Sequence, residues 1–202
     1  MKLHVFPLSP NAKKVMMAAH EAGVHAEIVM VDLMAGDQKK PEFMALNPNG
    51  KMPVLEYDDG DSLWESNAIA NQLAAIGGND LFPAGRDRFR IGQWQFWEMA
   101  HWAPATSAFI GAHFFDAPID REKATETLQS FAKVLDGHLD GRDWLVGNGM
   151  TTADISVAST LCYREVCGMP LGDVPNIDRW MGRISERESW KSVTSDPVPE
   201  LA

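Results

Sequence analysis

The sequence predicts an α/β domain followed by an all-helical domain. Three observations support this division of the 202 residues. Short apolar runs bounded by turn residues alternate with helical patterns within residues 1–78. Residues 79–85 are rich in turn formers and read as a linker. In residues 86–202 the strand signals stop, and large apolar side chains recur at helical spacing.

Composition and charge exclude several classes of protein. A hydrophobic content of 45% and a charged content of 23% are ordinary for a globular protein. The formal net charge is −10 and no basic face or tail is present, so we expect neither nucleic acid nor membrane as a partner. No apolar stretch is long enough for a bilayer span or a signal peptide, so we expect a cytoplasmic protein. Cys162 and Cys167 form no metal-binding motif, and we expect no metal.

The first half of the α/β domain reads as a β-α-β unit. Residues 2–7 alternate as a strand, and Ser9 followed by Pro10 marks the start of a helix. Gly23 ends this helix. Residues 25–33 are apolar on both faces, which predicts a buried strand parallel to the first.

The second half completes the order β-α-β-α-β-β-α with a mixed sheet. After a polar loop, residues 41–46 are long enough for one or two helical turns. Residues 54–57 read as a strand, and an Asp-Gly turn predicts that 62–64 return antiparallel to it. A helix begins at 65–67 and stops at the glycine pair 77–78. This is the thioredoxin-like arrangement.

The second domain reads as a helical bundle. A helical pattern over residues 86–115 is dense in large apolar side chains, and Pro104 is expected to kink or interrupt it. Residues 119–139 are amphipathic. Residues 151–154 match a capping box that starts a buried helix, and 176–185 form a further helix.

Three segments at turns or helix starts would meet at one edge of such a sheet. Residues 9–11 open the first helix. Met52 and Pro53 end a turn, Asn-Pro-Asn-Gly-Lys-Met-Pro, that would leave the Met52 backbone facing outward. Residues 65–66 start a helix whose N–H groups and dipole suit a carboxylate. Together they describe a site for an extended ligand with a carboxylate at each end and a backbone amide between.

Each part of this site also has a purely structural explanation. Ser9 and Ser66 are explained equally well as residues that only cap their helices. Taken alone, the turn before Pro53 is better explained as a loop that leads into a strand, and Lys39 and Lys51 as solvated surface. The occurrence of all the parts in the required order favours the binding site.

The whole chain resembles the cytosolic glutathione transferase family, of a serine-type or asparagine-containing bacterial class. The resemblance rests on Ser9-Pro10-Asn11 and on the segments 47–54, 65–69 and 151–154. It implies that glutathione is the co-substrate.

The resemblance also implies how glutathione is held. The Met52–Pro53 bond would be cis, and the Met52 backbone would pair with the cysteinyl part of the ligand. Glu65 and Ser66 would hold the γ-glutamyl end. Three side chains are expected at the glycyl carboxylate: Gln38, Lys39 and Lys51.

The same resemblance places the glutathione sulfur near Ser9 and Asn11. A free thiol has a pKa of about 8.5 and the thiolate is the nucleophile, so a hydroxyl or amide donor would favour the reactive form. Serine-type members use the serine, and another bacterial and fungal branch uses the asparagine two residues later. Both alternatives stay open. A tyrosine-type member is excluded because Phe6 has no hydroxyl.

The function implied is an enzyme, a glutathione transferase that attacks a hydrophobic electrophile. His101, Trp102 and Phe109 are the candidate acceptor wall, with packing as the alternative role. Two other functions stay open: a glutathione-dependent disulfide reductase or peroxidase, and a non-catalytic binding or regulatory protein. The resemblance implies a homodimer, and the aromatic residues of the first long helix support one.

Overall fold

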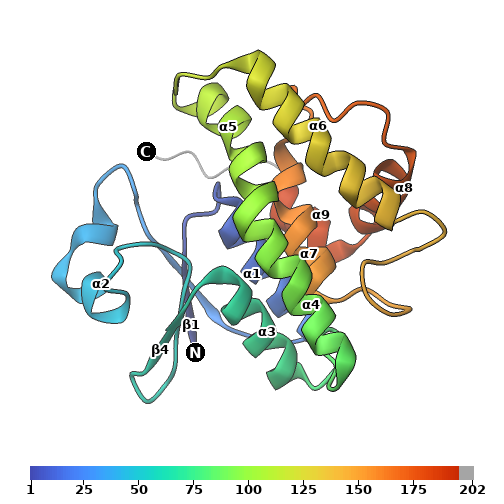
Figure 1. Cartoon of the computed structure of the whole chain (residues 1–202). Helices are drawn as coiled ribbons and strands as arrows, with labels where there is room; N and C mark the ends of the chain where they lie inside the picture. The colour runs from blue at the N-terminus through green and yellow to red at the C-terminus, as the bar shows by residue number, and fades with distance from the viewer. Residues whose placement is uncertain (196–202) are drawn as a thin grey trace. The chain divides into compact units, whose positions relative to one another are not determined.

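The computed structural model describes residues 1–195 and divides them into two compact units. The first unit is Met1–Phe82 together with residues 188–195, and the second is Pro83–Arg187 (Figure 1). The boundary between Phe82 and Pro83 falls inside the linker expected at 79–85. The final residues of the expected helical domain, 196–202, lie outside the described part.

A four-stranded mixed sheet forms the centre of the first unit, as the sequence predicts. Its strands are β1 (Lys2–Val5), β2 (Glu27–Met30), β3 (Val54–Glu56) and β4 (Ser62–Trp64). The order across the sheet is β2-β1-β3-β4, with β1 parallel to β2 and the other two pairs antiparallel. The helices of this unit are α1 (Pro10–Ala22), the 3-10 turn η1 (Asp37–Lys39), α2 (Pro41–Leu46), α3 (Ser66–Gly77) and α9 (Glu188–Thr194).

Strand alternation assigns the helices to the two faces of the sheet. His4 makes an edge-on contact with Phe43 of α2, at 6.1 Å between ring centroids. Leu3 and Val5, the neighbours of His4 on β1, point the other way and are fully buried. Helices α1 and α3 pack together on that other face (Figure 1). The N-termini of α1 and α3 therefore lie in one layer of the unit.

The expectation that the second strand is buried on both faces is wrong. β2 is only four residues long and lies at an edge of the sheet. Ile28 and Met30 are each 45% exposed. An apolar run of this kind predicts a parallel strand that is covered on both faces, but β3 takes the inner position beside β1 and leaves β2 at the edge.

Helix α9 is an element that the sequence analysis does not predict. It packs on α1, and it therefore groups with the first unit although it follows the helical region in the chain. Trp190 and Val193 are buried, and the Lys13 ammonium donates to the carbonyl of Val193. The observed division thus differs from the expected one, in which 86–202 form a single domain.

The second unit is entirely helical in its regular structure. Its elements are α4 (Arg86–Trp97), the π-helical turn η2 (Glu98–Trp102), α5 (Ala103–Phe114), α6 (Arg121–His138), α7 (Thr152–Ser159), the 3-10 turn η3 (Thr160–Tyr163) and α8 (Pro175–Ser185). The interruption expected near Pro104 is present, because a π-helical turn precedes the α5 helix in which Pro104 is the second residue.

Helix α7 is the core of this unit, and every one of its residues is buried. The expected capping box is present between Thr151 and Asp154. The Asp154 carboxylate also accepts hydrogen bonds of 2.9 Å from the Leu145 N–H and the Trp180 indole. Burial raises the pKa of Asp154, and these hydrogen bonds oppose that shift. None of the helices in residues 1–195 has the length and apolarity that a bilayer crossing requires.

Candidate functional site

The start of α1 presents the two residues expected at the sulfur. Ser9 is the N-cap residue, with extended backbone at φ −74° and ψ 129°, yet its side chain makes no capping hydrogen bond. Asn11 is the second residue of the helix and is partly exposed. The structure therefore does not support the alternative in which the Ser9 hydroxyl serves only as a cap.

The turn before β3 is organised by the buried side chain of Asn47. Its amide nitrogen donates to the Lys51 carbonyl at 2.5 Å, and its oxygen accepts from the Asn49 N–H at 3.0 Å. The Met52–Pro53 bond is cis, the isomer that the resemblance implies. The backbone N–H and C=O of Met52 form no hydrogen bond with any residue in the described range. An extended ligand could pair with both groups.

The start of α3 carries a strained residue. Glu65 is the N-cap and has φ 73°, in the left-handed region that residues other than glycine rarely adopt. Such a conformation costs about 1–3 kcal/mol and is concentrated at functional sites. Ser66 follows as the first helical residue and is buried, whereas Glu65 is exposed.

A hydrogen-bonded chain joins the starts of α1 and α3. The Lys14 ammonium donates to the Ser66 hydroxyl at 3.1 Å, and that hydroxyl donates to Asn11 Oδ1 at 3.2 Å. Ser66 and Asn11 were expected in separate roles, and the structure brings them into direct contact. Sequence reasoning missed Lys14, which is fully buried. Helical spacing could have identified it: Lys14 precedes Met17 by three residues and Ala18 by four, so it lies on the same buried side of α1.

The residues expected at the glycyl carboxylate lie on η1 and on the turn. The backbone carbonyl oxygen of Gln38 lies close to Gly50. A Cβ added to Gly50 would be 3.1 Å from this oxygen. The side-chain oxygen of Gln38 is buried without a hydrogen-bond partner in the described structure. Lys39 and Lys51 are exposed. The structure therefore brings Gln38 beside the turn and leaves the two lysines at the surface.

A separate pocket of about 390 Å³ lies on the α2 side of the sheet. His4 Nε2 and Glu56 Oε2 are 2.7 Å apart in its wall, and this contact holds the pKa of Glu56 below its usual value. Its rim holds the pair Lys40–Asp37, at 2.6 Å. None of the residues expected to bind glutathione lines this pocket.

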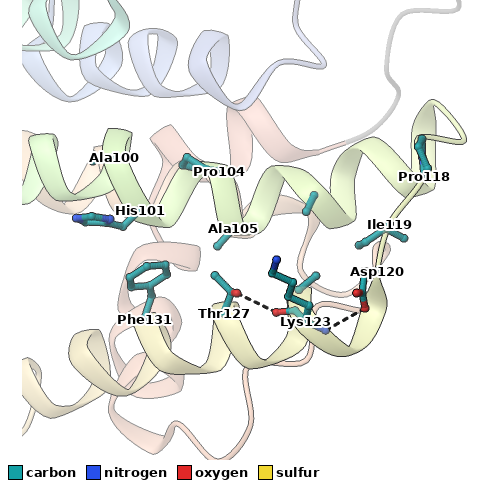
Figure 2. A pocket seen from close by; sticks show the side chains of 12 residues that line it. Ala100, His101, Pro104, Ala105, Pro118, Ile119, Asp120, Lys123, Thr127 and Phe131 are labelled. Carbon is teal, nitrogen blue, oxygen red and sulfur yellow. Dashed lines mark hydrogen bonds between the residues drawn. The ribbon is translucent and has the colours of Figure 1, made fainter.

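The second unit contains a pocket of about 430 Å³ between α5 and α6 (Figure 2). His101 lines it and stacks on Phe131, with ring centroids 5.2 Å apart. Trp102 and Phe109, the other two acceptor candidates, are 0% and 2% exposed. The indole N–H of Trp102 donates a hydrogen bond of 3.0 Å to the Val157 carbonyl in the core of the unit. The acceptor role of these three residues stays a prediction.

No group of three or more His, Cys, Asp or Glu side chains within residues 1–195 is arranged to hold a metal ion. The candidate site offers hydroxyl, amide and backbone donors together with two helix N-termini.

Comparisons with known proteins identify the family of the chain. A family model described as "Glutathione S-transferase, N-terminal domain" matches residues 8–76, and one described as "Glutathione S-transferase, C-terminal domain" matches residues 97–188. Glutathione S-transferase 3 of Zea mays is 34% identical, over 98% of this chain and 96% of its own. The chain belongs to the glutathione S-transferase family.

Solved structures of related proteins have the same fold. Glutathione transferase F2 from Populus trichocarpa superposes with a TM-score of 0.85 at 27% identity, over 95% of this chain and 96% of the other. A glutathione transferase from Pseudomonas putida, with one glutathione disulfide bound per subunit, gives 0.83 at 26% identity, over 97% and 91%. The predicted fold class, a thioredoxin-like domain followed by helices, is confirmed.

Proposed function

We propose that this protein is a glutathione transferase that stabilises the glutathione thiolate for attack on a hydrophobic electrophile. The observation that carries the proposal is the Ser66–Asn11 hydrogen bond at 3.2 Å. It joins the N-termini of α1 and α3, so that two helix dipoles and the N–H groups of two first turns would serve one site. An anionic ligand with both a carboxylate and a thiolate is suited to such a place.

Glutathione is proposed to lie along this edge of the sheet as an extended peptide. The N-terminus of α3, with Glu65 and Ser66, holds the γ-glutamyl end. The backbone of Met52 pairs with the cysteinyl part, next to the cis Pro53. The glycyl carboxylate is held by three side chains: Gln38, Lys39 and Lys51.

The sulfur is proposed to lie at the start of α1, within reach of Ser9 and Asn11. The Ser9 hydroxyl is not used as a cap, and it can therefore donate to a thiolate. Asn11 offers an amide donor. Each donor, together with the positive end of the helix dipole, would lower the pKa of the bound thiol.

Steady-state kinetics of Ser9→Ala and Asn11→Ala test these roles. With glutathione and an aromatic halide as substrates, we expect the variant that lacks the sulfur donor to lose roughly 100- to 1,000-fold in turnover, as loss of one hydrogen-bond donor to a developing anion does. Ser130→Ala, on the exposed side of α6, is the matched control. The proposal fails if neither variant loses turnover, or if the wild type conjugates no electrophile.

A second candidate reaction is glutathione-dependent reduction of a disulfide or peroxide. The glutathione disulfide bound to the Pseudomonas putida relative favours it. In this reaction the product is oxidised glutathione, whereas a transferase releases a thioether, so product analysis separates the two. A non-catalytic binding protein is the third candidate, and calorimetric titration with glutathione and its disulfide tests binding independently of turnover.

We also propose that the enzyme is a cytoplasmic homodimer. Exposed apolar side chains on the α4 helix, Phe89 and Phe96, support a subunit interface there.

A further inference from the structure

We propose that Lys14 is a positioning residue for the thiolate donor: acting through Ser66, it fixes the Asn11 amide with its NH₂ group turned toward the glutathione sulfur. The inference rests on the proposed function and deepens it. Lys14 itself does not touch the ligand in this proposal. It sets which end of Asn11 the ligand meets.

The direction of the hydrogen-bonded chain follows from its first member. A lysine ammonium has three N–H donors and no acceptor, so at the 3.1 Å contact the Ser66 hydroxyl must be the acceptor. That hydroxyl has one proton left to donate, and it is directed at the Asn11 side chain, 3.2 Å away. Only the oxygen of an amide accepts, so Oδ1 of Asn11 faces Ser66 and the NH₂ group faces away from it.

The orientation of this amide decides what Asn11 contributes to chemistry. An NH₂ group donates to a thiolate and stabilises it, whereas an amide oxygen in the same place would repel the anion. The Ser66 hydroxyl needs an acceptor for its one proton, and the Lys14 ammonium cannot be that acceptor, so the proton goes to Oδ1 of Asn11. A neutral partner in place of Lys14 could take this proton instead. Ser66 would then have no proton for Asn11 and could only accept from its NH₂ group, which would leave the oxygen facing the sulfur. A group that only donates therefore favours the observed direction.

Burial makes Lys14 fit for this role. Its side chain is 0% exposed, and a buried ammonium needs hydrogen-bond partners in place of water. Its contact with Ser66 links α1 to α3, across 52 positions in sequence. A solvated lysine would exchange its partners with water and would not hold the chain in one direction.

The test compares Lys14→Met and Lys14→Gln with the wild type. Methionine keeps the length and removes the donor, while glutamine keeps a donor but adds an acceptor, so that the chain can reverse. Lys14→Gln also provides a milder change if the methionine variant does not fold, as judged by circular dichroism. The matched control is Lys13→Met, because Lys13 is the neighbouring lysine on α1 but donates to the Val193 carbonyl on α9.

The readout is the pKa of the thiol of bound glutathione, from the ultraviolet absorbance of the thiolate against pH. We expect both Lys14 variants to raise it by about one unit, which means about tenfold less thiolate below the pKa, and Lys13→Met to leave it unchanged.

A double substitution separates positioning from a direct charge effect. If Lys14 acts through Asn11, Lys14→Gln in an Asn11→Ala background adds no further change in the thiol pKa. An unchanged thiol pKa in both folded Lys14 variants overturns the inference, and so does an equal rise with and without Asn11. A wild type that binds no glutathione overturns the proposed function instead, so the two failures are distinguishable.

Discussion

Two groups of polar side chains in the first unit are joined by specific hydrogen bonds. Lys14, Ser66 and Asn11 form one chain on the helical face of the sheet, and His4 and Glu56 form a pair on the α2 face. Because a polar group removed from water must be hydrogen-bonded, each arrangement is sensitive to removal of one member. The first is the chain on which the proposed role of Lys14 depends, and the second has a consequence for stability.

Replacing Glu56 should flatten the dependence of stability on pH. The hydrogen bond from His4, with a smaller contribution from Lys2, lowers the pKa of Glu56 in the folded protein. A lowered carboxyl pKa contributes stability above the unfolded value, and this contribution is lost as pH falls through the folded value. We therefore compare the unfolding free energy at neutral pH with its value at a pH below the ordinary glutamate pKa. This free energy should fall more in wild type than in Glu56→Gln. Urea unfolding at both pH values measures this, with exposed Glu126→Gln as control. Parallel losses in wild type and Glu56→Gln would contradict it.

At the scale of elements, the layer that holds the site depends on a close approach of two helices. Gly77, the last residue of α3, lies against the end of α1. A Cβ on Gly77 would be 2.3 Å from the carbonyl oxygen of Ala22, a distance that real contacts do not allow. Backbone atoms cannot move aside as a flexible side chain can, so any larger residue must push the helices apart. The hydrogen-bonded chain between their N-termini depends on the same packing.

Gly77→Ala should destabilise the protein by roughly 2–3 kcal/mol, the usual scale of overpacking. Gly182→Ala is the matched control, because Gly182 lies within the helix α8 but has nothing within 4 Å of the added Cβ. In that control the better helix propensity of alanine should give up to about 1 kcal/mol of stabilisation. Urea unfolding at neutral pH measures both. Equal effects of the two substitutions would show that the approach of α1 and α3 is not tightly constrained.

At the scale of the whole molecule, the most exposed aromatic residues point to self-association. Phe89 and Phe96 are 78% and 79% exposed and lie seven residues apart, so they share one side of α4. Met99 is 43% exposed and lies in the π-helical turn η2, which follows α4, three residues after Phe96. A run of large apolar side chains in water is unfavourable in an isolated soluble chain and is typical of an interface. The net charge of −10 works against non-specific association.

Phe96→Glu should convert the proposed homodimer to a monomer. The substitution places a carboxylate in an apolar contact, and each subunit of a two-fold interface would carry it. Light scattering at micromolar concentration measures the mass. Phe115→Glu is the control, because Phe115 is 68% exposed but lies beyond the end of α5. A monomeric wild type, or a Phe96→Glu variant that stays dimeric, would rule out this interface.

The sequence by itself determined the fold class and the order of most elements, and it indicated the segments of the candidate site. These features depend on local rules: Ser9-Pro10 at a helix start, the Asn47–Met52 turn, and the capping box of Thr151 and Asp154. Each is set by backbone preferences within a few residues, so it can be read without knowledge of the rest of the chain.

Only the tertiary structure decided which residues meet. It placed β2 at the sheet edge, added α9 to the first unit, and buried Trp102 and Phe109 within the helical unit. It also turned Lys14 inward to Ser66, across 52 positions in sequence. Such contacts depend on how helices and strands pack, which many distant residues set together, and no local pattern encodes them. The sequence therefore indicated the three segments of the site, and the packing of α1 on α3 connected two of them.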